Sequence, residues 1–147
     1  MSDDAEGPEY DVDFREHPEE YEVGRGEEGV FKCEPYKSEL LPLWSIETLE
    51  RAEEGAEAIR EQFREYRAED DFPGMDMARK YLQMGWTRAM RYAKYPGGRK
   101  YDADGEERDP QEWYDEEKRA IALVYKEHLD AVREDDHYRR RREAWED

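Results

Sequence analysis

The chain has 147 residues and a formal net charge of −18, because 42 acidic side chains outnumber 24 basic ones. This length allows one modest hydrophobic core, so we expect a single domain over residues 1–147. No apolar run approaches the roughly 18 residues that a membrane-spanning helix needs. The acidic start of the chain also lacks the basic and then apolar regions of a signal peptide. These features predict a cytoplasmic protein that does not enter a membrane.

Hydrophobic residues make up only 36% of the chain, yet aromatic residues reach 13%. Disordered chains are poor in aromatic residues. We therefore expect a folded domain with a carboxylate-rich surface, as in halophilic proteins that stay soluble in a salt-rich cytoplasm. An ordinary acidic protein is the alternative. Cys33 is the only cysteine, so an internal disulfide and a thiolate metal site are excluded, and no motif predicts a cofactor.

The first third of the chain predicts the minor β part of a mainly α fold. Residues 1–9 are expected to form an acidic tail, and residues 10–44 a hairpin followed by an extended arm. Apolar residues alternate after residue 10, and residues 30–33 (VFKC) are typical of a short strand. The glycine-rich segment before them favours a tight turn over a phosphate-binding loop, because it lacks the Lys-Ser/Thr of a P-loop. Residues 35–44 (PYKSELLPLW) are predicted to lie extended across the domain.

Residues 45–147 are predicted to form a three-helix core with a short C-terminal helix. Ser45 is the expected N-cap of a helix that runs to about residue 69, and Asp109 the N-cap of a later helix with proline at its first position. Residues 137–145 (HYRRRREAW) predict the short Arg-rich helix. The expected centre of the core contains Phe63, Trp86 and Ile121, and His128 is predicted to be a hydrogen-bonded core imidazole.

Residues 77–101 contain seven basic side chains and no acidic one, in a chain that is otherwise strongly acidic. Read as a helix over residues 77–95, the segment has two faces. The first face is apolar and mostly small, and contains Ala78, Leu82, Gly85, Trp86, Ala89 and Ala93. The second is basic and aromatic, and contains Lys80, Tyr81, Met84, Arg88, Arg91, Tyr92 and Tyr95. Asp71 or Asp76 is expected to cap the helix, which should end at the PGG sequence of residues 96–98.

We interpret the second face and the GGRKY loop as a nucleic-acid-binding surface, on RNA or DNA. Arginine and lysine bind phosphates, while tyrosine rings and arginine planes stack on bases. The predicted binding residues are Lys80, Arg88, Arg91, Tyr92, Lys94, Tyr95, Arg99 and Lys100. At molar salt the Debye length falls to about 3 Å, so such a surface would act through close contacts with a compact nucleic-acid feature.

Three other interpretations remain open. Arg88, Arg91 and Lys94 would be neutralised if they paired with carboxylates of the helix over residues 45–69. The surface would serve a protein–protein adaptor if its partner were an acidic protein. An enzyme acting on a phosphorylated ligand would need an active site of dispersed residues, because no nucleophile-elbow, zinc-protease or dinucleotide motif occurs. The D-A-D-G sequence at residues 102–105 resembles part of a calcium loop but lacks its other ligands, so we expect a plain hairpin turn.

Two segments carry a resemblance: GVFKCEPYKSELLPLW and DDFPGMDMARKYLQMGWTRAMRYAKYPGGRKYD. They resemble an uncharacterised domain-of-unknown-function family of small microbial and phage proteins. The likeness extends from about Asp11 to Tyr138 and is most specific in the MARKYLQMG and GRKYD parts. The resemblance implies a compact domain with no established activity and therefore supplies no catalytic residues.

Overall fold

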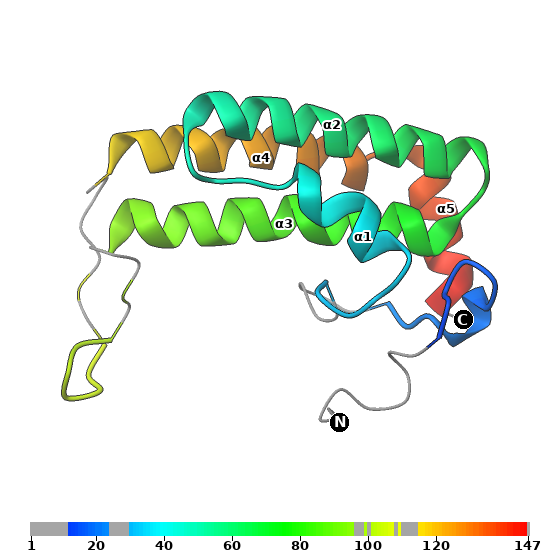
Figure 1. Cartoon of the computed structure of the whole chain (residues 1–147), viewed down its shortest axis with the longest axis horizontal. Coiled ribbons are helices and arrows are strands. Elements are labelled where there is room, and N and C mark those ends of the chain that lie inside the picture. Colours follow the sequence, from blue (N-terminus) through cyan, green and yellow to red (C-terminus); the bar gives the residue numbers. More distant parts are fainter. Residues whose placement is uncertain are drawn as a thin grey trace.

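Three long helices form the framework of the protein in its computed structural model. The structure describes residues 12–23, 30–95, 99, 101–107, 109 and 115–146. The long helices are α2 (Leu49–Ala68), α3 (Phe72–Lys94) and α4 (Glu116–Arg133). As Figure 1 shows, these helices run side by side, α5 (Asp136–Glu146) crosses one end of the bundle, and the short α1 (Tyr36–Leu40) packs on its flank. The predicted mainly α fold is confirmed. None of the described helices is long and apolar enough to cross a membrane.

Side chains that accept backbone hydrogen bonds mark where each long helix begins. Asp71 accepts from the N–H of Gly74 at the start of α3, as the sequence predicted. The predicted caps of the other two helices were wrong, because Thr48 caps α2 and Asp115 caps α4. Ser45 lies outside α2, where its N–H donates to the hydroxyl of Tyr125 at 3.2 Å. Residues 110–114 lie outside the described part of the chain.

The segment before α2 differs most from the prediction. Residues 35–44 were expected to be extended, but they form α1 and a 3₁₀ helix, Leu41–Leu43. Tyr36 and Leu40 are both fully buried, because a helical turn places residues four apart on the same side, against the bundle. The expected hairpin strands are also absent from the described residues. Residues 12–23 contain the 3₁₀ helix Pro18–Glu20, and residues 30–32 form a turn.

The small-residue face of α3 makes a close contact with α4. Ala78, Leu82, Gly85 and Ala89 are buried there, and α4 packs against this part of the bundle. The ring of Tyr125 from α4 lies directly over Gly85, since a Cβ built on that glycine would come within 2.4 Å of the ring. The predicted core residues Phe63 and Ile121 are buried, whereas Trp86 is only half-buried.

A buried carboxylate joins the N-terminal segment, α3 and α5. Asp76 on α3 is fully buried and forms an ion pair with Arg79, one turn further along the same helix, at 3.0 Å. The hydroxyl of Tyr21 donates to one oxygen of Asp76 at 2.5 Å, and the hydroxyl of Tyr138 on α5 donates to the other at 2.6 Å. Burial and the neighbouring Asp76 carboxylate raise the pKa of Tyr138 to about 12. We call Tyr21, Asp76, Arg79 and Tyr138 the Asp76 cluster.

The Asp76 cluster predicts a large stability loss for Asp76→Asn. This substitution leaves the Arg79 guanidinium buried without its counter-charge, so we expect the free energy of unfolding to fall by about 3–5 kcal/mol. Urea unfolding followed by circular dichroism measures the change. The control is Asp130→Asn, which breaks the exposed Lys126–Asp130 pair and should cost at most about 1 kcal/mol. Equal losses in the two variants would contradict the importance of the cluster.

Gly85→Ala tests the contact between α3 and α4. Helix propensity alone predicts a gain of about 1 kcal/mol for this change. We expect a net loss of about 1–3 kcal/mol instead, because the added methyl group overlaps the Tyr125 ring, whose hydroxyl is held by the carbonyl of Ser45 at 2.8 Å. Thermal unfolding of Gly85→Ala, compared with the exposed control Glu54→Ala, distinguishes the gain in stability from the loss. A melting temperature above that of the wild type would contradict the close contact.

Candidate nucleic-acid interface

The two halves of α3 differ in exposure. Every residue from Phe72 to Leu82 is buried, whereas the second half emerges onto the surface. Arg88, Arg91 and Tyr92 are exposed and Lys94 is half-buried. Spacings of three and four residues place Arg88, Arg91 and Tyr92 on one side of the helix, and Lys94 lies one turn beyond Arg91. We call Arg88, Arg91, Tyr92 and Lys94 the α3 surface.

Two aromatic rings hold the guanidinium of Arg88. Its Cζ lies 5.5 Å from the ring centre of Phe31 and 6.0 Å from that of Trp44, distances typical of cation–π contacts. These rings come from the turn before α1 and from the segment after it. In the described part of the chain, Arg88 has no carboxylate partner. The rings therefore fix the position of the guanidinium while its N–H donors stay available to a ligand.

Arg91 and Lys94 also lack an ion pair with any carboxylate that the structure describes. Many other surface cations are paired within their own helix or its flank. Examples are Arg51 with Glu47 at 2.6 Å, Arg64 with Glu61 at 2.7 Å and Lys126 with Asp130 at 2.8 Å. Neutralisation of Arg88, Arg91 and Lys94 by carboxylates of α2 is thus not seen among the described residues.

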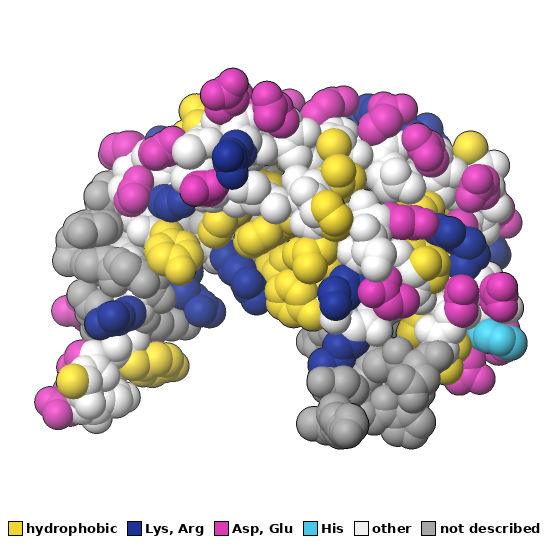
Figure 2. All heavy atoms as spheres, viewed as in Figure 1, with side chains coloured by type: hydrophobic (Ala, Val, Ile, Leu, Met, Phe, Trp, Pro, Cys, Tyr) yellow, Lys and Arg dark blue, Asp and Glu magenta, His cyan; other side chains and the backbone are white. Residues whose placement is uncertain are grey.

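Two lysines of α4 lie close to aromatic rings of α3. Tyr92 is 41% exposed, and the ammonium of Lys118 from α4 lies 5.8 Å from its ring centre. Trp86 has a similar neighbour, since the ammonium of Lys126 lies 5.4 Å from its ring. In the view of Figure 2, the lower side of the molecule is hollowed below α3, with hydrophobic side chains in the hollow and Lys and Arg side chains near them. Asp and Glu side chains dominate the convex side above it.

The structure places other predicted binding residues away from this surface. Lys80 was wrongly assigned to the outer face, since it is only 3% exposed. Its ammonium lies 5.1 Å from the ring centre of the buried Tyr21. Tyr81 and Met84, assigned to the same face, are fully buried as well, and the N-terminal segment covers Tyr81. The hydroxyl of Tyr81 donates to the carbonyl of Val30 in that cover.

The end of α3 agrees with the prediction, but only part of the following loop is described. The helix ends at Lys94, and its C-cap Tyr95 is buried rather than exposed as expected. Arg99 is exposed. Residues 96–98 and Lys100 lie outside the described residues.

The predicted turn at residues 102–105 is a hairpin turn. Tyr101 and Glu107 form an antiparallel bridge on either side of it, and Gly105 has a φ of 83°, which favours glycine. The Oδ1 atom of Asp102 accepts from the N–H groups of Asp104 and Glu106, so the local backbone uses one of the oxygens that a cation would need. No group of His, Cys, Asp and Glu residues in the described segments is arranged to hold a metal ion.

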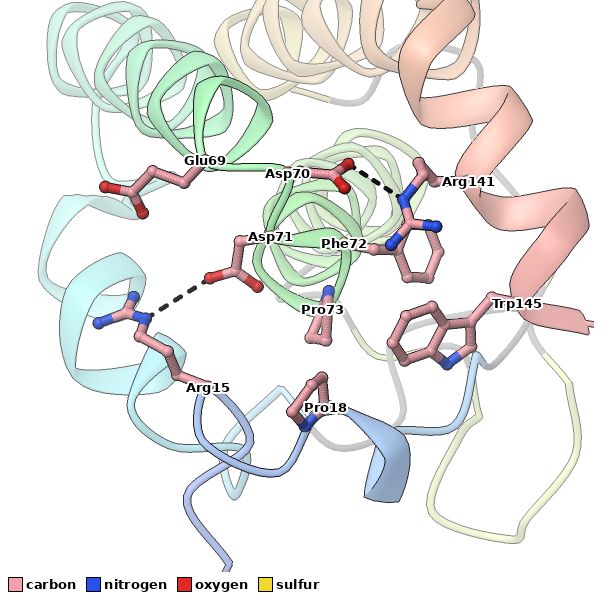
Figure 3. A pocket seen from close by; sticks show the side chains of 9 residues that line it. All are labelled: Arg15, Pro18, Glu69, Asp70, Asp71, Phe72, Pro73, Arg141 and Trp145. Atoms are coloured by element: carbon pink, nitrogen blue, oxygen red, sulfur yellow. Dashed lines mark hydrogen bonds and ion pairs between the residues drawn. The ribbon is translucent and has the colours of Figure 1, made fainter.

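A cavity of about 260 Å³ lies at the opposite end of α3. Figure 3 shows Arg15, Asp71, Phe72, Arg141 and Trp145 among its lining residues. Both arginines are paired with carboxylates, since Arg15 contacts Asp71 at 3.5 Å and Arg141 contacts Asp70 at 3.0 Å. Asp71 in turn caps α3. Both arginine charges of this cavity are therefore engaged within the protein, unlike those of the α3 surface.

Cys33 and His128 are candidate reactive side chains, and both lie in buried or partly buried environments. Burial raises the pKa of the Cys33 thiol to about 12, so this cysteine is a poor nucleophile near neutral pH. His128 was predicted to be a core imidazole, and it is partly buried with its Nδ1 at 3.1 Å from a guanidinium nitrogen of Arg60. Burial and the Arg60 charge lower the pKa of His128. Neither residue lies in the described cavity or on the α3 surface.

Comparison with known proteins gives one match. Residues 4–147 match the family described as "Domain of unknown function (DUF4385)". The chain belongs to this family. No curated protein and no solved structure matches it. The predicted resemblance to a domain of unknown function is thus confirmed, and membership of DUF4385 assigns no residue a role.

Sequence reasoning missed the two rings that hold Arg88. Phe31 was assigned to a strand and Trp44 to an extended arm, and neither was connected with the basic segment. Phe31 is 57 positions from Arg88 in the chain, so no helical spacing links them. The sequence carries no signal for this contact, because the exposure of Phe31 becomes visible only in the folded structure.

The absence of a described partner for Arg91 predicts that it contributes little to stability. Arg91→Gln should change the free energy of unfolding by no more than about 0.5 kcal/mol. Arg79→Gln on the same helix should cost about 3–5 kcal/mol, because it leaves the Asp76 carboxylate buried without its cation. Urea unfolding compares the two variants. A loss above about 1.5 kcal/mol for Arg91→Gln would show that this cation has a structural partner.

Proposed function

We propose that this DUF4385 protein is a non-enzymatic accessory protein that binds RNA or DNA through the α3 surface. Arg88, Arg91 and Lys94 bind phosphates, and Tyr92 contacts the bases or sugars. Arg99 and Lys100 extend the contact along the GGRKY loop. Guanidinium groups suit this role because two parallel N–H donors match two phosphate oxygens.

The state of Arg88 carries the proposal. Its guanidinium lies against Phe31 and Trp44, and it pairs with no described carboxylate. In a protein with 42 acidic residues, a cation that pairs with aromatic rings retains its hydrogen-bonding capacity for an external anion. The rings also restrict the side chain before a ligand arrives, which lowers the entropy cost of binding.

The charge of the whole chain supports a short-range contact. With a net charge of −18, most of the surface repels a polyanion, which would favour contact at the α3 surface. We infer a halophilic, cytoplasmic setting, in which the Debye length is about 3 Å at molar salt and long-range attraction is weak. Binding then depends on defined hydrogen bonds and ring contacts rather than on counterion release.

The same surface would also fit an acidic protein, which is the alternative. A pull-down from nuclease-treated extract separates the two functions. Retention of a protein partner after complete removal of nucleic acid would favour the adaptor, and loss of all bound material would favour nucleic acid.

The direct test is a filter-binding series with radiolabelled RNA and DNA at several KCl concentrations up to about 1 M. Arg88→Glu/Arg91→Glu should weaken binding at least tenfold and reduce the salt slope of log K by about 2, one for each lost phosphate contact. The matched control is Arg51→Glu/Arg64→Glu, which changes the net charge equally but on α2. Equal retention by the wild type and both variants would contradict the proposal.

A further inference from the structure

Phe31 is an exposed aromatic residue in a fixed position. Its side chain is 43% exposed. One residue on each side of it is buried: Val30 is 3% exposed and Cys33 is 4% exposed. The carbonyl of Val30 accepts from the Tyr81 hydroxyl, and the carbonyl of Cys33 accepts from the N–H of Lys37 at 2.8 Å. These contacts hold the turn, so Phe31 presents its ring on a rigid support.

A cation lies beside this ring. The guanidinium of Arg88 lies over the Phe31 ring at 5.5 Å and is itself exposed. Leu123 is a contrasting case, since it is half exposed on α4 but has no aromatic ring. An exposed ring and a cation with available donors match the two parts of a nucleotide, its base and its phosphate.

We propose that Phe31 stacks on an unpaired base of a single-stranded nucleic acid, while Arg88 binds an adjacent phosphate. This inference rests on the proposed function and specifies its ligand. Bases in a duplex are stacked on one another and cannot reach a ring on the protein surface, whereas bases in single strands and loops can. Phe31 and Arg88 therefore select single strands over duplexes of the same sequence.

Fluorescence anisotropy with three labelled probes of equal length tests this inference. The probes are a single strand of uridine or thymidine nucleotides, an abasic strand with the same phosphates, and a duplex. The wild type should bind the strand with bases roughly five- to hundredfold more tightly than the abasic strand, as is typical of one stacked base. Comparison of the uridine and thymidine strands shows whether RNA or DNA is preferred.

Substitutions at Phe31 assign the preference to this ring. Phe31→Leu should remove most of the preference for bases. It should weaken binding of the abasic strand far less, because Trp44 still contacts the Arg88 guanidinium and the phosphate contacts remain. Phe31→Tyr should restore the preference, since it keeps an aromatic ring. Leu123→Ala is the control, and it should behave as the wild type.

The outcomes separate this inference from the proposed function. Equal binding of the base-containing and abasic strands by the wild type would overturn stacking but retain phosphate binding. A base preference that persists in Phe31→Leu would also overturn the role of Phe31. Binding of none of the three probes would overturn both the stacking and the nucleic-acid function, and the wild-type comparison needs no variant to fold.

Discussion

The burial of the Asp76 carboxylate constrains the rest of the structure. A charge removed from water is stable only when hydrogen bonds and an opposite charge surround it. For Asp76 these groups come from α3 itself, from the N-terminal segment and from α5. The first half of α3 must therefore be enclosed by segments from both ends of the described chain. Only the second half is left to form a surface.

This division explains how one basic segment has two roles. In the enclosed half, Arg79 pairs with Asp76, and Lys80 lies over the ring of Tyr21. In the exposed half, Arg88 contacts rings, and no described carboxylate pairs with Arg91 or Lys94. The absence of acidic residues from positions 77–101 thus has two causes. The enclosed half already contains its carboxylate at Asp76, and the exposed half keeps its cations unpaired with described carboxylates.

Helical periodicity predicted the long elements well, because amphipathic spacing depends on local geometry. The long helix α2, the small face of α3 and the Arg-rich α5 follow directly from the sequence. Residues 35–44 were predicted less well, since they were expected to be extended, whereas Tyr36 and Leu40 are buried one helical turn apart. The sequence marked Arg88, Arg91 and Tyr92 correctly as exposed. It did not show that Lys80 is enclosed or that Phe31 contacts Arg88, because both depend on contacts between distant segments.

We propose that Arg88 and Arg91 are available to an external anion, whereas Arg79 is engaged by Asp76 within the fold. Nuclear magnetic resonance of the arginine Nε–H groups, during titration with a short single-stranded oligonucleotide at high KCl, measures this most directly. We expect the signals of Arg88 and Arg91 to shift with increasing ligand and the signal of Arg79 to stay unchanged. Unchanged signals for Arg88 and Arg91, or shifts confined to the arginines of α5, would contradict it.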